Sequence, residues 1–321
     1  MLILQTFFAT FCIFLLEATQ AQALRNSRHL DQNQPHQCTL HIIETIWGDG
    51  TTSSSFECQI LSSIDASERV LQIRDSPDWL LNALENDEIN SGTDVLHFDP
   101  SLIIDGDLVI GDSDNVSIEY KQPLDDITNS AAAGIAQGQV GQRSALVVHV
   151  KGKDASTSTQ PHGPNSLADN IFGTSGDHVN LRSQMKACSY GQFDLVPFNG
   201  RTSTGVEVTD GVVSIEIPNI IQGADHKILF SSVKSTAYSV LGDLRAQYDH
   251  VMFCLPPGTA TNWAAFAYVN DNISVYNDDM CNHPTVQMHE IGHNLGLAHS
   301  NGPYAGDFYL DTSGVVSDFL H

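Results

Sequence analysis

The stretch HEIGHNLGLAH, residues 289–299, places three histidines and one glutamate within eleven residues. Residues four positions apart lie on one face of an α-helix, so His289 and His293 can present their imidazoles to a single zinc ion. Gly296 can adopt a positive φ, which ends a helix and turns the chain. We therefore expect a helix that begins near Thr285, followed by a turn that brings His299 round as the third nitrogen ligand.

This spacing also predicts a chemistry. Three histidine ligands leave one position of a tetrahedral zinc ion open, which is typical of catalytic rather than structural zinc sites. Glu290 lies about 100° further round the helix than His289, where its carboxylate can reach a water beside the ion without binding the ion. Zinc-activated water with Glu290 as general base predicts peptide-bond hydrolysis. The alternative is a surface helix with solvated histidines, but H-E-x-x-H-x-x-G-x-x-H is much more specific than H-E-x-x-H alone. Three imidazoles would also suit other divalent metals.

The composition is that of a soluble globular protein, because 41% of the 321 residues are hydrophobic and 16% are charged. This length is sufficient for two domains of ordinary size. The formal net charge of −24 argues against nucleic acid or an anionic membrane as a partner. Two N-x-S sequons, at Asn115 and Asn272, are compatible with a glycoprotein. The oligomeric state is left open.

Residues 1–23 have the pattern of a cleaved signal peptide. An apolar run from Leu2 to Leu16 precedes Ala21 and Ala23, which have the small-x-small spacing that signal peptidase reads. A membrane anchor is the alternative, but the run is shorter than the ~20 residues that a spanning helix needs. We therefore expect a secreted, extracellular protein with no stable membrane anchor.

The remaining chain divides at a stretch of small and polar residues, 129–141, which is the best linker candidate. Residues 24–142 are expected to be mainly β, since CTLHIIETIW and FECQIL flank a Gly/Ser/Thr turn and predict a hairpin. Residues 143–321 alternate strands with helices, which predicts an α/β sandwich on a mixed sheet. Within it, we expect a hairpin that turns at Asp210-Gly211 and one amphipathic helix over 235–248.

Five cysteines remain after the signal peptide, an odd number for an oxidising compartment. They are Cys38, Cys58, Cys188, Cys254 and Cys281. A disulfide across the predicted hairpin accounts for Cys38 and Cys58. The alternative is that one of them supplies a thiolate to the zinc and holds a zymogen inactive. The pairing among the last three is left open.

Several stretches of the second half, together with the motif, resemble the gametolysin family of secreted algal zinc metalloproteases in the metzincin clan. They are SALVVHV, NLRSQMKACSYGQF, DHVMFCLPPGT and AFAYVNDNISVYNDDMC. The resemblance implies a metzincin-like zincin catalytic domain with a mixed twisted sheet and an active-site helix, preceded by a mainly β pro-segment. It implies zinc ligands His289, His293 and His299, Glu290 as catalytic base, a zymogen, and protein or glycoprotein substrates such as a cell-wall matrix. By analogy, residues 264–269 would form the sheet edge on which an extended peptide docks.

The sequence departs from this family after the third histidine. Relatives place methionines beneath the zinc, in a segment like D-x-S-G-M-M-G, whereas DTSGVVS has Val315 and Val316 there. We therefore expect a chain truncated at its C-terminus, with the methionine turn absent and the partner of one late cysteine lost. The second functional hypothesis follows from this: an inactive, secreted zinc-binding pseudoprotease with a binding or structural role.

Other side chains could take part in the site. His283 could be an extra ligand, but it precedes Pro284 in a loop and is expected at the surface. His149 lies in a strand and is expected to be a core histidine. Tyr304 or Tyr309 could stabilise an oxyanion, although packing roles are the simpler expectation.

Overall fold

The computed structural model of the chain describes residues 36–60, 69–74, 76–85, 88–111, 116–120, 140–153 and 163–297. The predicted signal peptide and nearly all of the 129–141 linker lie outside these residues, as does everything after Leu297. No helix in the described part of the chain is long and apolar enough to cross a membrane.

The second half of the chain is built on a mixed sheet with the strand order β12-β8-β13-β15-β14. The first four strands run parallel, and β14 runs antiparallel to β15. Central parallel strands are buried on both faces, which explains why the runs ALVVHV in β8 and HVMFCL in β13 are almost entirely apolar and buried. The strands are β8 (Gly141–Lys151), β9 (Phe193–Pro197), β12 (Val212–Glu216), β13 (His250–Leu255), β14 (Trp263–Tyr268) and β15 (Ile273–Asn277).

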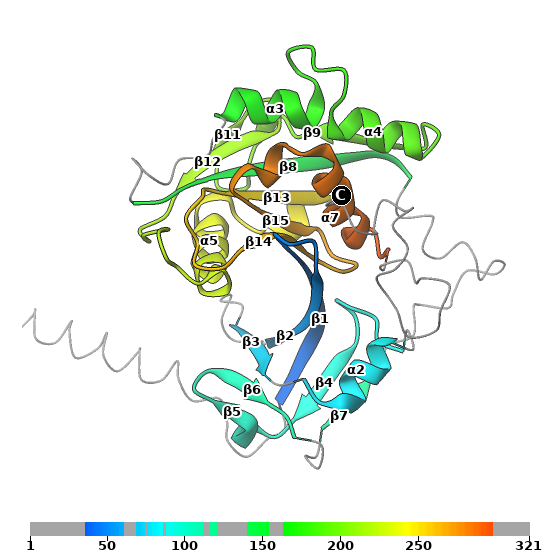
Figure 1. The fold of residues 1–321 in the computed structure, drawn as a ribbon, viewed down its shortest axis with the longest axis vertical. Helices are drawn as coiled ribbons and strands as arrows, with labels where there is room; N and C mark the ends of the chain where they lie inside the picture. The colour runs from blue at the N-terminus through cyan, green and yellow to red at the C-terminus, as the bar shows by residue number, and fades with distance from the viewer. Residues whose placement is uncertain are drawn as a thin grey trace, which may run out of the picture.

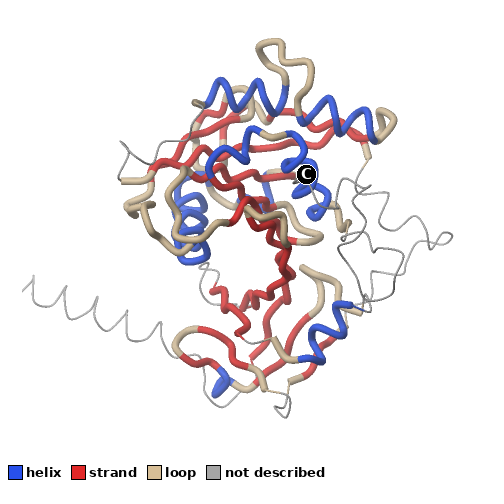
Figure 2. The backbone as a smooth tube through the Cα atoms, viewed as in Figure 1, coloured by secondary structure: helices blue, strands red, loops and turns tan. Residues whose placement is uncertain are grey.

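Helices cover both faces of this sheet, as Figures 1 and 2 show. On one face lie α3 (Pro164–Phe172), α4 (Leu181–Cys188), the short 3-10 helix η2 (Asp278–Asn282) and α7 (Pro284–Asn294). On the other face lies α5 (His226–Leu241), followed by α6 (Leu244–Gln247). A small ribbon, β10 (Gly200–Arg201) with β11 (Glu207–Val208), stands outside the main sheet. The predicted α/β sandwich on a mixed sheet is confirmed.

The first half of the chain is mainly β, with its own apolar cluster. The predicted hairpin forms between β1 and β2, and a disulfide joins Cys38 to Cys58 across it. Asp105 and Gly106 both have positive φ and form the tight turn between two short strands, β5 and β6. The elements are β1 (His36–Trp47), β2 (Thr52–Ile60), β3 (Arg69–Arg74), α2 (Asp78–Glu85), β4 (Val95–Phe98), η1 (Pro100–Leu102), β5 (Ile103–Ile104), β6 (Asp107–Val109) and β7 (Ser117–Glu119).

The two halves share one sheet. The end of β1 pairs antiparallel with β14, from Ile43 opposite Tyr268 to Trp47 opposite Trp263. Because of this pairing, the described strands form a continuous 13-stranded sheet that runs from β12 into the N-terminal half. In Figure 1, β1 (blue) leaves the main sheet beside β14 and extends into that half.

Two local expectations were wrong. Asp210 and Gly211 do turn the chain, but β12 then pairs with β8 as a parallel strand, and only Thr209 and Val212 bridge across the turn. The helix expected over 235–248 is divided at Gly242, whose φ of 86° is outside the helical region. The Asp243 side chain then caps a separate short helix, α6.

Candidate metal centre

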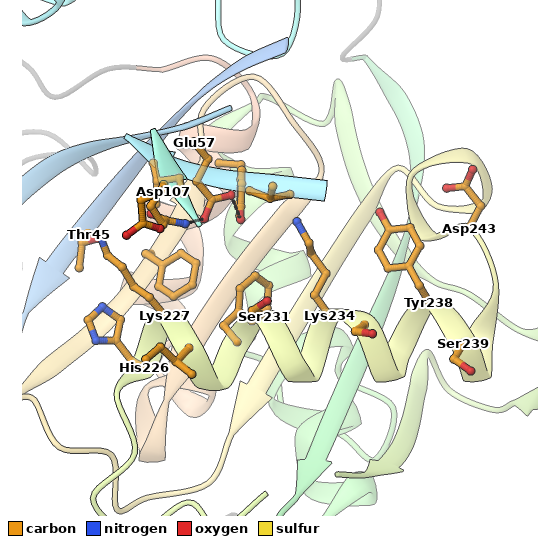
Figure 3. Close-up of a pocket in the computed structure, with 18 of the residues that line it drawn as sticks. Thr45, Glu57, Asp107, His226, Lys227, Ser231, Lys234, Tyr238, Ser239 and Asp243 are labelled. Carbon is orange, nitrogen blue, oxygen red and sulfur yellow. Dashed lines mark hydrogen bonds between the residues drawn. The ribbon is translucent and has the colours of Figure 1, made fainter. Parts of the chain in front are cut away.

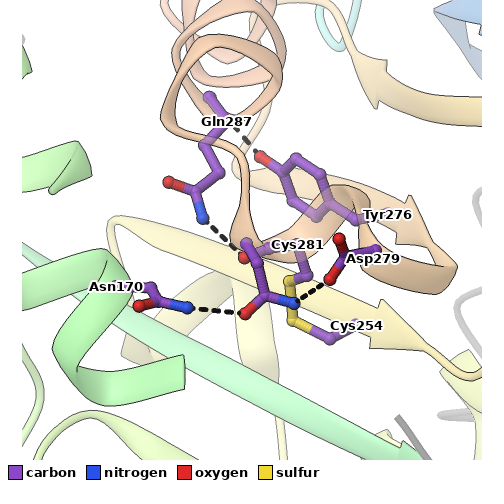
Figure 4. The surroundings of a disulfide bond; sticks show 7 residues. Asn170, Cys254, Tyr276, Asp279, Cys281 and Gln287 are labelled. Atoms are coloured by element: carbon purple, nitrogen blue, oxygen red, sulfur yellow. Dashed lines mark hydrogen bonds between the residues drawn. A yellow bond between two sulfur atoms is a disulfide. The ribbon is translucent and has the colours of Figure 1, made fainter. Parts of the chain in front are cut away.

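The start of α7, which carries the predicted metal-binding motif, is anchored to the main sheet. A disulfide joins Cys254 of β13 to Cys281 of η2, directly before the helix. Figure 4 shows Gln287 reaching from α7 back to the carbonyl oxygen of Cys281. Asn170 of α3 donates a hydrogen bond to Asn282 at 2.8 Å. The position of the helix is therefore fixed by covalent and polar contacts to elements that are distant in sequence.

The two histidines of the helix converge, as their spacing predicts. His289 and His293 are both buried, and their Nε2 atoms lie 3.0 Å apart. Nδ1 of His293 donates to the carbonyl oxygen of Leu297 at 2.9 Å, so in the neutral ring the lone pair is on Nε2. Two nitrogens bound to one tetrahedral zinc would be ~3.3 Å apart. The pair therefore fits a shared metal ion, with a backbone carbonyl that orients one ring.

The end of α7 produces that carbonyl contact. The N–H of Leu297 bonds to the carbonyl of Gly292, and the N–H of Gly296 bonds to that of His293, both at 2.9 Å. This is a Schellman turn, and Gly296 supplies the left-handed residue with φ of 80°. The predicted role of Gly296 as the end of the helix is confirmed.

Glu290, between the two histidines in the sequence of α7, has no solvent exposure. Neither carboxylate oxygen has a hydrogen-bond partner among the described residues. Burial raises its pKa well above the usual range, and the like charge of Glu44 raises the pKa further. A buried carboxylate without a partner is costly, and an adjacent cation would offset that cost. The environment of Glu290 therefore also fits a metal ion beside it.

Comparison with known families agrees with this geometry. The family model described as gametolysin peptidase M11 matches residues 157–317, half of the chain and the whole of the motif. The chain belongs to this gametolysin family. Since this is a metallopeptidase family, a metal cofactor and a peptidase activity are the general expectation for the chain.

Two further comparisons add nothing to the gametolysin assignment. No curated protein matches the chain. A solved structure titled "Structure of a chaperone-substrate complex" aligns with 51% of this chain and 25% of its own length, at 19% identity and a TM-score of 0.27. That likeness is too weak to support any statement about fold or function.

The third predicted ligand of this gametolysin-family chain, His299, lies outside the described residues. So do Tyr304, Tyr309 and the valines at 315 and 316. Within the described ranges, no group of three or more His, Cys, Asp or Glu side chains is placed to hold a metal. The structure thus brings the nitrogens of two of the three predicted ligands together, and Glu290 lies between them in the sequence of the same helix.

Glu44 is a residue near the site that the sequence did not indicate. It lies on β1 opposite Ala267 of β14, and 8% of it is exposed. Burial raises its pKa to about 7, against the opposing effect of a 2.8 Å hydrogen bond from Ser54. The available signal was a single acidic residue within the otherwise apolar and β-branched run HIIETIW.

The other candidates have structural roles. Cys38 and Cys58 form a disulfide, so the thiolate-switch alternative does not apply to this structure. The side chain of His283 is 48% exposed and bonds to Asp279 at 3.2 Å, which agrees with the expected surface position. His149 is buried in β8 with Nδ1 2.9 Å from the hydroxyl of Ser214, as expected for a core histidine.

A cavity of about 910 Å³ lies on the opposite face of the sheet, between α5 and the β1–β3 strands. Figure 3 shows Lys227, Lys234 and Tyr238 of α5 facing Thr45 and Glu57 of the hairpin across it. No member of the metal-binding motif lines this cavity, so it is separate from the candidate metal centre.

Proposed function

We propose that this chain is a secreted zinc endopeptidase, made as a zymogen, that hydrolyses peptide bonds of extracellular proteins or glycoproteins. The observation that carries the proposal is the pair of buried imidazole nitrogens, 3.0 Å apart, on a helix that also carries a buried carboxylate with no hydrogen-bond partner among the described residues. His289, His293 and His299 would hold the ion. Membership of a metallopeptidase family supports the same reading.

In the proposed reaction, the ion supplies Lewis acidity and the side chains of the protein transfer the proton. Zinc, when bound, supplies Lewis acidity that makes water nucleophilic near neutral pH and polarises the scissile carbonyl. Glu290 accepts the proton of the attacking water on a carboxylate oxygen and then delivers it to the leaving amine. The Leu297 carbonyl would keep Nε2 of His293 directed toward a bound ion.

Secretion is supported by the sequence of residues 1–23 and by two disulfides among the described residues. The substrate class rests on the family resemblance. A polypeptide in extended form would pair with β14, which contacts α7, only after β1 of the predicted pro-segment has left that side of the strand.

The test compares the chain from Leu24 onward with its Glu290→Gln and His283→Ala variants. Zinc content is measured on each purified protein, and casein and gelatin hydrolysis are measured before and after limited proteolysis. We expect one zinc per chain in all three, and hydrolysis in all but Glu290→Gln. His283→Ala is the matched control, since this histidine is exposed and outside the motif.

A metal-free wild-type protein would refute the metal centre. One zinc per chain without hydrolysis in any form would instead favour the second hypothesis, a zinc-binding protein with a structural or binding role. The substitution of the family's methionines by Val315 and Val316 is the observation in its favour.

A further inference from the structure

One of the two N-x-S sequons, Asn272-Ile273-Ser274, lies in the part of the chain that the structure describes. It spans the end of the turn after β14 and the start of β15, and Asn272 borders a cavity of about 550 Å³. By position alone, a sequon at a turn beside open space is a candidate for an N-linked glycan. The side-chain contacts of Asn272 lead to the opposite conclusion.

The amide nitrogen of Asn272, to which a glycan would be attached, is directed at two backbone carbonyls. Nδ2 donates to the carbonyl oxygen of Tyr248 at 2.9 Å and to that of Leu244 at 3.4 Å. A primary amide has two N–H groups, so both are in use. Leu244 is the first residue of α6 and Tyr248 is its C-cap. The side chain therefore bridges the turn after β14 to α6.

A glycan on Asn272 would replace one of these two amide hydrogens by a sugar carbon. A single C–N bond is about 1.45 Å long, so a carbon in the direction of either carbonyl oxygen would lie roughly 2 Å or less from that oxygen. Even close carbon–oxygen contacts in proteins are about 3.3 Å. Rotation of the side chain would relieve this clash, but it would break both hydrogen bonds to α6.

The other polar groups of the sequon offer no alternative arrangement. Oδ1 of Asn272 is buried and accepts no hydrogen bond within the described residues. Exchange of the two amide atoms would point this oxygen at two carbonyl oxygens, which accept but do not donate. The hydroxyl of Ser274, the third residue of the sequon, belongs to a side chain with no solvent exposure. The folded sequon therefore presents neither its amide nitrogen nor its hydroxyl to an enzyme.

The same turn is joined to its surroundings by further contacts. The carboxylate of Asp271 accepts from Nη2 of Arg245 at 2.8 Å and from Nε at 3.1 Å, and Arg245 is a residue of α6. The N–H of Val251 in β13 donates to the carbonyl of Asn272 at 2.7 Å. Displacement of Asn272 would therefore disturb the contacts of the turn with both α6 and β13.

We propose that the Asn272 sequon is an internal bridge, and that a chain with a glycan on Asn272 cannot complete this fold. The inference rests on the proposed secretion of the chain, because N-linked glycans belong to secreted proteins. Transfer of a glycan would have to precede folding, and the modified chain would then lack the contacts that dock α6. The native protein has an unmodified Asn272.

The first experiment tests the bridge on the chain from Leu24 onward, produced in a bacterial periplasm, where disulfides form and this sequon is left unmodified. Asn272→Asp replaces the donating nitrogen by an oxygen that faces two carbonyls. Asn199→Asp is the matched control. It adds the same charge at an exposed asparagine whose Oδ1 accepts from the N–H of Asp210 at 2.7 Å, a bond that aspartate keeps.

We expect the melting temperature of Asn272→Asp to fall by about 5 °C, because two carbonyls lose their donor and face a third acceptor. The melting temperature of Asn199→Asp should change by less than about 2 °C. A wild-type melting temperature in Asn272→Asp would show that the amide nitrogen does not bridge the turn to α6, and would overturn the inference.

The second experiment measures glycan occupancy of the full chain in a eukaryotic secretory host. Peptides that contain residue 272 are analysed by mass spectrometry, from the medium and from the cells. Arg201→Asn is the positive control, since it creates the sequon N-T-S at a side chain that is 72% exposed. Ser274→Ala is the unmodified reference, because it removes the sequon and keeps Asn272.

In the medium, we expect position 272 of the wild type to match the Ser274→Ala reference, and position 201 of the control to carry a glycan. A glycan on Asn272 of the secreted, folded protein would overturn the inference. Failure of the proposed secretion has a different signature. In that case none of the chains reaches the medium, while the melting temperatures still decide whether Asn272 is a bridge.

Discussion

At the scale of the residue, Glu44 gives the protein a pH dependence of known sign. Its pKa of about 7 in the folded state exceeds the ordinary value of 4.5. The folded protein therefore binds the proton more tightly than the unfolded chain, and stability is lost as pH rises from about 4.5 to about 7. A shift of this size corresponds to about 3 kcal/mol, as an upper estimate.

Glu44→Gln should remove this dependence. We expect the variant to match wild type near pH 4.5 and to be more stable at pH 8, by up to about 3 kcal/mol. Urea denaturation at both pH values, with chelator present, measures the difference. Glu88→Gln, at an exposed position of the same half, is the control. An equal effect of Glu44→Gln at both pH values would contradict the assigned burial of the charge.

The contrast between Glu290 and Glu44 shows what a sequence can reveal about a site. His289 and His293 are four residues apart on a helix, so helical periodicity alone places them on one face, and in the structure their Nε2 atoms lie 3.0 Å apart. Glu44 reaches the same place through a strand pairing between residues more than 200 positions apart. No local sequence pattern predicts such a long-range pairing, so the position of Glu44 near the site could not be predicted from the sequence.

At the scale of the element, the turn after α7 positions a ligand as well as ending a helix. Gly296→Ala should cost about 1–2 kcal/mol, because φ of 80° strains a residue that has a Cβ. It should also weaken zinc affinity, because the turn places the Leu297 carbonyl against His293. Denaturation and competition with a chromophoric chelator measure the two effects.

Gly163→Ala is the matched control, since this glycine has φ of −76° and open space around the position of a Cβ. It should leave zinc affinity unchanged and affect only the free energy of unfolding, through the weaker N-cap that alanine gives α3. Full zinc affinity in Gly296→Ala would show that the turn does not orient His293.

The disulfide before α7 supports a second prediction for this helix. The Cys254→Ser/Cys281→Ser double variant loses a cross-link between residues 27 positions apart. The loss should cost about 3 kcal/mol and loosen the start of α7, which thermal unfolding and zinc titration would both detect. Cys188→Ser should have no effect, since Cys188 is exposed and unpaired within the described residues. An equally stable double variant would mean that η2 is held by its polar contacts alone.

Elements were predictable where the signal was local. The spacing and end of α7, the hairpin of β1 and β2 and the buried runs of β8 and β13 follow from periodicity and composition. The strand partner of β12 does not follow from the local sequence. The buried apolar side chains of β12 could pack beside any neighbouring strand, and the topology of the whole sheet brings β8 there. The break at Gly242 was missed for a simpler reason: an isolated glycine is tolerated within many helices.

At the scale of the whole molecule, the shared sheet changes what cleavage between the halves can accomplish. The sequence predicts a pro-segment, 24–142, that proteolysis would remove. In the structure, β1 of that segment pairs with both β2 and β14. A buried hydrogen bond from Tyr268 to Glu57 and the 3.3 Å approach of His41 to Asp271 also join the hairpin to the second half. One cut in the connection would leave all of these contacts in place.

We therefore expect a nicked chain to stay together. A protease site is engineered between Tyr120 and Val140, and the cut protein is passed over a sizing column with and without urea. The two fragments should co-elute at the size of the intact chain in buffer and separate in urea, because only unfolding disrupts the pairing of β1 with β14. Hydrolysis of casein should rise only when β1 is displaced, so the co-eluting complex should remain close to the uncut protein in activity. Separation in buffer, or full activity in a complex that still co-elutes, would show that β1 does not hold the halves together at the site.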